Sequence, residues 1–152
     1  MVTVRATTAL PIGADEAFAL ALKPATFAYV ARGVMRVPAL EAVGASFEAV
    51  PGAQARGRMW WLGVIPSWTH HLRVVAIEPA DHTIRTAEHG GPLRAWNHRL
   101  TFTPAPGGAR GCEYADEIEI DAGALTLPTA LFARAFFALR QARWRRLAAV
   151  LS

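Results

Sequence analysis

Cysteine and lysine are almost absent from this sequence, which holds only Cys112 and Lys23 of these two types among its 152 residues. With one cysteine, the chain can form no internal disulfide and no cysteine-based metal cluster. Acidic residues are also fewer than basic ones, 12 against 16, and the formal net charge is +4 at pH 7. Five arginines lie within 134–146, but the others are scattered among apolar residues. We therefore expect no nucleic-acid partner.

Long hydrophobic runs are absent as well. No apolar run reaches the roughly 18 residues that a membrane span needs, and residues 1–5 lack the basic flank and apolar core of a signal peptide. Hydrophobic residues nevertheless make up 53% of the chain and charged residues only 18%, which is typical of a globular protein. We expect a single cytoplasmic domain over residues 1–152, without a transmembrane segment and with a sizeable core.

The C-terminal segment predicts one long helix. Ala130 to Leu151 contains no glycine or proline, and Pro128 suits a first helical turn. At 100° per residue, one wide side of this helix is apolar. That side carries Phe132, Phe136, Phe137, Leu139, Trp144, Leu147, Val150 and Leu151. The opposite side carries Arg134, Gln141 and Arg145. So wide an apolar face requires a large partner surface.

The segments before this helix predict mostly strands. A β-branched stretch over 2–10 predicts the first strand, and two short helices follow at about 14–22 and 24–30. Short strands are indicated at 34–37 and 47–50 in a segment rich in breakers. Longer strands are then predicted over 56–64, 68–77, 82–88, 94–103 and 110–121. This order predicts an α+β fold in which a curved antiparallel sheet of about six to seven strands wraps around the C-terminal helix.

Several segments, taken in this order, match a known family. They are Pro11 to Phe18 after the first strand, Trp96-Asn97-His98, the Gly107-Gly108 hairpin, Asp116-Glu117-Ile118, and the helix with Phe136, Arg140, Trp144 and Leu147. With these features the whole chain resembles the START-like, or SRPBCC, helix-grip superfamily of ligand-binding and polyketide-cyclase-like proteins. The resemblance implies an apolar cavity between sheet and helix, which holds lipids, polyketides, quinones or hormones in different members. The fold alone does not choose among these ligands.

The strand at 110–121 places a carboxylate on its buried side. Glu113, Glu117, Glu119 and Asp121 share one face, and Cys112, Tyr114, Asp116, Ile118 and Ile120 share the other. An unpaired buried charge is costly, so Asp116 needs partners or must be protonated. If the hairpin turns at Pro106-Gly107, residues whose numbers sum to about 214 pair across the strands, with an error of one or two. His98 then lies near Asp116.

A candidate polar cluster follows from this pairing. It contains His98, Asp116, Tyr114 and either Arg140 or Arg143, and it would fix the polar end of a mostly apolar ligand. The alternative, which we favour, is a structural ion pair between Asp116 and one arginine.

Further residues are candidates for lining the cavity. They are Trp61 (or its neighbour Trp60), Trp68, His70, Trp96 and Phe136. At least two of the tryptophans are expected to be ordinary core residues. His70 and His71 point to opposite faces of a strand and cannot chelate one ion, so we predict no metal site. The sequence contains no phosphate loop or nucleotide fingerprint, so we predict no cofactor.

Three functions remain open. The leading hypothesis is binding or transport of a small hydrophobic ligand, such as a lipid, polyketide or quinone-like molecule. The alternative is a polyketide cyclase or dehydratase-like enzyme, in which His98 acts as general acid or base and Asp116 orients it. The third is a protein-interaction module, with a homodimer among the candidate assemblies. The sequence does not decide whether the protein is an enzyme.

Overall fold

The computed structural model describes residues 1–39 and 49–152. Within them, one antiparallel sheet of seven strands has the order β1-β7-β6-β5-β4-β3-β2. Its strands are β1 (Val2–Leu10), β2 (Met35–Arg36), β3 (Gln54–Trp61), β4 (Ile65–Glu78), β5 (Thr83–Gly90), β6 (Leu93–Pro104) and β7 (Cys112–Asp121). The predicted curved sheet is confirmed. Of the short strand predicted at 47–50, residues 47–48 lie outside the described residues, and residues 49–50 are not in a strand.

Three α-helices lie wholly within the described residues: α1 (Ala14–Ala21), α2 (Pro24–Ala31) and α4 (Thr126–Leu151). Short 3-10 turns lie at Pro79–Asp81, Pro106–Gly108 and Gly123–Leu125. Asp15 and Glu16 lie in the first turn of α1, where negative charge suits the helix dipole. Pro24 occupies the start of α2. The two short helices after the first strand are therefore confirmed. Among the described residues, no helix combines the length and apolarity needed to cross a membrane.

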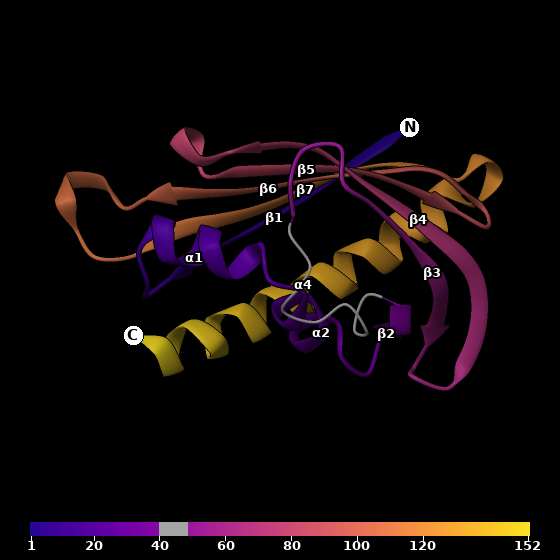
Figure 1. The fold of residues 1–152 in the computed structure, drawn as a ribbon, viewed down its shortest axis with the longest axis horizontal. Helices are drawn as coiled ribbons and strands as arrows, with labels where there is room; N and C mark the ends of the chain where they lie inside the picture. Colours follow the sequence, from indigo (N-terminus) through magenta and orange to yellow (C-terminus); the bar gives the residue numbers. More distant parts are fainter. Residues whose placement is uncertain (40–48) are drawn as a thin grey trace.

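The sheet curls around α4 (Figure 1), and β3 and β4 bend furthest from its plane. Register shifts accompany this bending, between Val74 and Ala76 on β4 and between Glu88 and Gly90 on β5. Bulges of this kind bend a strand and increase its twist. They give the sheet a concave face, and α4 lies on that side.

The pairing of β6 with β7 sets the position of the polar residues on the concave face. His98 lies opposite Ile118, and Leu100 lies opposite Asp116, so paired residue numbers sum to 216 and not 214. A difference of two residues leaves every side chain on its predicted face, because side chains alternate with a period of two. His98 and Asp116 are thus diagonal neighbours across the strands.

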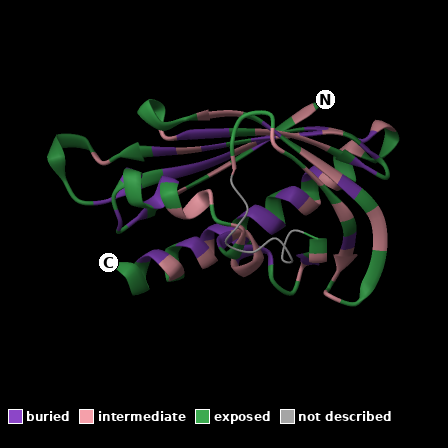
Figure 2. Ribbon diagram, viewed as in Figure 1, coloured by how far each residue is buried: buried purple, intermediate pink, exposed green. Residues whose placement is uncertain are grey.

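The buried side of α4 is rotated from the predicted one. Leu139 and Val150 are 38% and 83% exposed, whereas Gln141 is 4% exposed. Figure 2 shows the buried residues of α4 on its side toward the sheet. Small residues, Ala133 and Ala148, are fully buried there and allow the helix to lie close to the strands. Gln141 is buried because its Nε2 donates a 2.7 Å hydrogen bond to the Ala6 carbonyl of β1.

Candidate functional site

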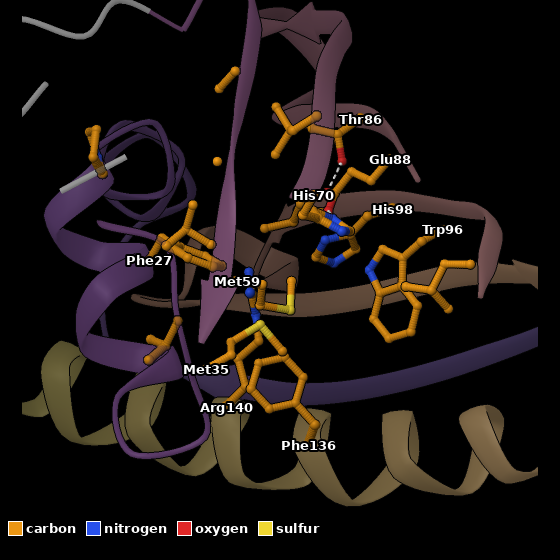
Figure 3. Close-up of a pocket in the computed structure, with 18 of the residues that line it drawn as sticks. Phe27, Met35, Met59, His70, Thr86, Glu88, Trp96, His98, Phe136 and Arg140 are labelled. Carbon is orange, nitrogen blue, oxygen red and sulfur yellow. Dashed lines mark hydrogen bonds and ion pairs between the residues drawn. The ribbon is translucent and has the colours of Figure 1, made fainter. Parts of the chain in front are cut away.

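A cavity of about 880 Å³ lies between the concave face of the sheet, α2 and α4. Figure 3 shows Phe27 on the α2 side, Met59 on the sheet and Phe136 on α4, all facing the same space. Most of the residues around the cavity are apolar. Its volume is that of a site for a small organic molecule, for which about 300–1,000 Å³ is usual.

Most of the predicted ligand-binding residues line this cavity. They are Trp61, Trp68, His70, Trp96, His98, Phe136 and Arg140. Tyr114 and Asp116 lie behind this lining, 0% and 1% exposed. Trp60 is also outside the lining and packs under the guanidinium of Arg58.

Arg143 is not brought to the cluster either. Its guanidinium donates hydrogen bonds to the carbonyl oxygens of Val30 and Arg32, at the end of α2. Because the last carbonyls of a helix have no partner within the helix, this contact satisfies them and fixes α2 against α4. Between the two arginines considered from the sequence, the structure places only Arg140 beside Asp116.

Asp116 is the centre of a buried polar network. Its Oδ1 lies 2.7 Å from Nε2 of His98 and 3.6 Å from Nε of Arg140. Nε of Arg140 also donates to the Tyr114 hydroxyl at 3.2 Å, and Gln141 Nε2 lies 3.5 Å from Asp116 Oδ2. Each partner comes from a different position on β6, β7 or α4, so the network joins the sheet to the helix.

The charges in this network determine which atoms carry protons. Burial alone would raise the pKa of Asp116, but the positive charge of Arg140 and the hydrogen bond from His98 hold it below its ordinary value. Asp116 is therefore a carboxylate at neutral pH, and Nε2 of His98 is the donor in their hydrogen bond. Burial raises the pKa of Tyr114, which stays a neutral phenol. Nδ1 of His98 forms no hydrogen bond with any described residue.

A second histidine–carboxylate pair lies on the neighbouring strands, and sequence reasoning missed half of it. Nε2 of His70 on β4 lies 2.8 Å from Oε2 of Glu88 on β5, and the Thr86 hydroxyl donates to Oε1 of Glu88 at 2.7 Å. The sequence did contain a signal for Glu88, because Ile84, Thr86 and Glu88 are spaced two residues apart and therefore share one face of the strand. Burial alone would raise the pKa of Glu88, but the hydrogen bond from His70 brings it below its ordinary value.

His70, Glu88, His98 and Asp116 together form a polar row, with one residue on each of β4, β5, β6 and β7. These four strands are neighbours in the sheet. Figure 3 shows His70, Glu88 and His98 close together, with Trp96 beside His98. The row is a polar strip across a mostly apolar wall. Arg140 extends toward it from α4.

The tryptophans of the wall are placed by specific contacts. Trp61 donates from Nε1 to the Ser67 hydroxyl at 2.9 Å, and its ring meets that of Trp68 edge to face at 5.7 Å. The Trp68 indole lies on the backbone of Gly90 and Gly91, where an added Cβ would come within 2.7 Å and 2.5 Å of its ring. These two glycines therefore make room for Trp68 in the cavity wall.

Three buried polar atoms of cavity-lining residues have no hydrogen-bond partner in the described part of the chain. They are Nε1 of Trp68, Nδ1 of His70 and Nε1 of Trp144. Leaving a buried polar group unpaired costs roughly 1–3 kcal/mol. The described residues contain no group of three or more His, Cys, Asp or Glu side chains placed to hold a metal ion.

Comparison with known proteins identifies the fold. Residues 33–151 match the family described as "Domain of unknown function (DUF8410)". No curated protein matches the chain significantly. Protein CV1439 from Chromobacterium violaceum has a similar structure, with a TM-score of 0.73 and 14% identity over 96% of this chain and 96% of that one.

Two other solved structures are similar at lower scores. Norcoclaurine synthase from Thalictrum flavum, in complex with dopamine and hydroxybenzaldehyde, has a TM-score of 0.66 and 10% identity over 99% of this chain and 88% of its own. Ara h 8.0201 has a TM-score of 0.60 and 12% identity over 94% and 97%. These likenesses show that the chain has the START-like helix-grip fold that its sequence resembles.

Proposed function

Because the chain belongs to the DUF8410 family, whose description states no function, we propose from the site itself that it binds a small, mostly apolar molecule between the sheet and α4. The observation that carries this proposal is the cavity of about 880 Å³. The wall contains Phe27, Met59, Trp96 and Phe136. Burying apolar ligand surface against it stabilises the complex by about 25 cal/mol per Å².

The polar groups on the wall would orient such a ligand. His98 and Arg140 line the cavity, and both are anchored from behind by Asp116. A few well-fixed polar groups in an apolar pocket are the usual source of ligand orientation. The structurally similar norcoclaurine synthase was solved with two small aromatic molecules, which supports an aromatic ligand for the same fold here.

A second candidate function is acid–base catalysis on the bound molecule. It is favoured by the orientation of His98: Asp116 fixes Nε2–H, and Nδ1 is left without a partner among the described residues. An imidazole held in one tautomer by a carboxylate is a suitable general base for a polyketide-like substrate. In this reading Asp116 is a positioning residue, because it lies behind the cavity lining.

Native mass spectrometry tests the binding proposal. The protein would be purified from its own host and sprayed under gentle conditions, then under denaturing conditions. We expect a noncovalent mass of a small organic molecule that is lost on denaturation. The discriminating control is Ala55→Trp, which places bulk at a cavity-lining residue and should abolish the added mass. An added mass that persists in this variant would count against binding in the cavity.

A further inference from the structure

The second histidine–carboxylate pair has a geometry that specifies a ligand group. Both oxygens of the Glu88 carboxylate are engaged, Oε2 with His70 Nε2 at 2.8 Å and Oε1 with the Thr86 hydroxyl at 2.7 Å. Each Glu88 oxygen is thus already an acceptor within the protein, and Glu88 itself also lines the cavity. Its role in this geometry is to hold the imidazole of His70, which lines the cavity.

The proton positions follow from the same contacts. An ionised carboxylate can only accept hydrogen bonds, so Nε2 of His70 carries the proton that is shared with Glu88. The pKa of Glu88 lies below its ordinary value, so this carboxyl group is ionised and acts as the acceptor. In the neutral imidazole, Nδ1 is then an acceptor. This atom is buried, since His70 is only 9% exposed, and it has no hydrogen-bond partner within the described residues.

A second unpartnered atom lies two residues away on the same face of β4. Nε1 of Trp68 is a donor only, and it too is buried without a partner in the described part of the chain. Because Gly90 and Gly91 have no Cβ, their backbone lies directly against the Trp68 ring and fixes the indole in the wall. This part of the wall therefore presents one acceptor, at His70, and one donor, at Trp68.

We propose that this pair of residues recognises a hydroxyl group on an apolar ligand, with His70 Nδ1 accepting the hydroxyl proton and Trp68 Nε1 available to donate to an oxygen. The ligand class is accordingly an alcohol or phenol. This inference rests on the proposed binding function and makes it more specific. Glu88 is a positioning residue, because it acts through His70.

The charges nearby favour a neutral ligand over an acid. Around the polar row, Glu88 and Asp116 supply two carboxylates and Arg140 supplies one guanidinium, whereas the other cationic lining residues, Lys23 and Arg56, are exposed. A ligand carboxylate beside the row would add a further negative charge to a buried site, which is costly. A hydroxyl group supplies the proton that His70 Nδ1 can accept and adds no charge.

The test compares two neutral probes, 2-naphthol and its methyl ether 2-methoxynaphthalene. Only 2-naphthol has a hydroxyl proton that His70 Nδ1 can accept. Binding of each would be measured at neutral pH by quenching of tryptophan fluorescence. One neutral hydrogen bond corresponds to about a threefold to tenfold difference in Kd. We expect the wild-type protein to prefer 2-naphthol by that factor.

Variants then assign the preference to His70. His70→Gln can keep a donor to Glu88 but lacks an atom equivalent to Nδ1, so the preference for 2-naphthol should disappear. Glu88→Gln should weaken the preference, because an amide no longer fixes the tautomer of His70. His71→Gln is the matched control, since His71 points to the other face, where it stacks on His89, and it should keep the wild-type preference.

Each result decides something. Equal affinities for the two probes in the wild type, or an unchanged preference in both His70→Gln and Glu88→Gln, would overturn the inference and leave the cavity as a nonselective apolar site. In that case a water molecule is the partner of His70 Nδ1. If neither probe binds the wild-type protein, the proposed function fails together with the inference.

Discussion

His98 and Asp116 are joined side chain to side chain across β6 and β7, with Nε2 of His98 2.7 Å from Oδ1 of Asp116. The carboxylate is 1% exposed and also lies beside Arg140. Asp116 therefore holds two cavity-lining residues without lining the cavity itself. This arrangement satisfies the charge of a buried arginine and fixes the orientation of an imidazole.

Removing the charge of Asp116 should mainly destabilise the protein. In Asp116→Asn, Arg140 remains buried without its counter-ion, and breaking such a pair costs roughly 3 kcal/mol or more. Urea unfolding should show this loss, while Glu117→Gln, on the outward face of the same strand, should change the free energy of unfolding by less than about 0.5 kcal/mol. A ligand affinity that collapses in Asp116→Asn with stability unchanged would contradict the structural role.

Stability should fall in acid because of two carboxylates. The pKa values of Asp116 and Glu88 are lowered from 3.8 and 4.5 in the folded protein. Below these ordinary values the unfolded chain binds more protons than the folded one, so the free energy of unfolding decreases as pH falls. The stabilisation is fully present above about pH 5. Urea unfolding at a series of pH values measures this slope.

The double variant Asp116→Asn/Glu88→Gln is the control for this pH dependence. Since it has neither carboxylate, its free energy of unfolding should vary less with pH over the acid range. The same slope in the double variant and the wild type would assign the pH dependence to other groups.

Cys112 should be unreactive in the folded protein. The thiol is 3% exposed, and burial raises its pKa to about 11, so little thiolate is present at mildly alkaline pH. A thiol-reactive disulfide reagent should label one thiol per chain in urea and almost none under native conditions. Rapid labelling of the native protein would show that β7 opens readily at its Cys112 end.

Gly91 should be required for the placement of Trp68. Gly91 has a φ of +53°, and an added Cβ would lie 2.5 Å from the Trp68 ring. Gly107, with a φ of +68°, has open space at the same position. Both alanine variants incur backbone strain of about 1 kcal/mol. We expect only Gly91→Ala also to alter the near-ultraviolet circular dichroism of the tryptophans; equal spectra for both variants would contradict this role.

Periodicity was sufficient to predict the fold and half of the site. The alternation of β7 identified Asp116 as buried, and the hairpin arithmetic brought His98 close to it even with a register error of two residues, because such an error keeps both side chains on their face. Arg140 was one of two candidates from the helix. The alternative, Arg143, differs from it by nearly one turn, and only the packing of α2 separates them.

The remaining features of the site depend on contacts between elements that are distant in sequence. Gln141 was predicted on the outer side of the helix, yet it is buried because the Ala6 carbonyl of β1 accepts its hydrogen bond. Glu88 shares a strand face with Ile84 and Thr86, but its partner His70 is 18 residues away on another strand. The cavity volume follows from how α2, α4 and the bulged strands pack, and no periodicity reports it.

Titration with the neutral apolar probe N-phenyl-1-naphthylamine is the most direct test of ligand binding in the cavity. The comparison is between Ala55→Trp, at a cavity-lining residue, and Ala87→Trp, on β5 between the lining residues Thr86 and Glu88 and so on its opposite face. We expect saturable binding of one probe per chain by the wild type and Ala87→Trp, and its loss in Ala55→Trp. No binding by the wild type, or undiminished binding by Ala55→Trp, would contradict it.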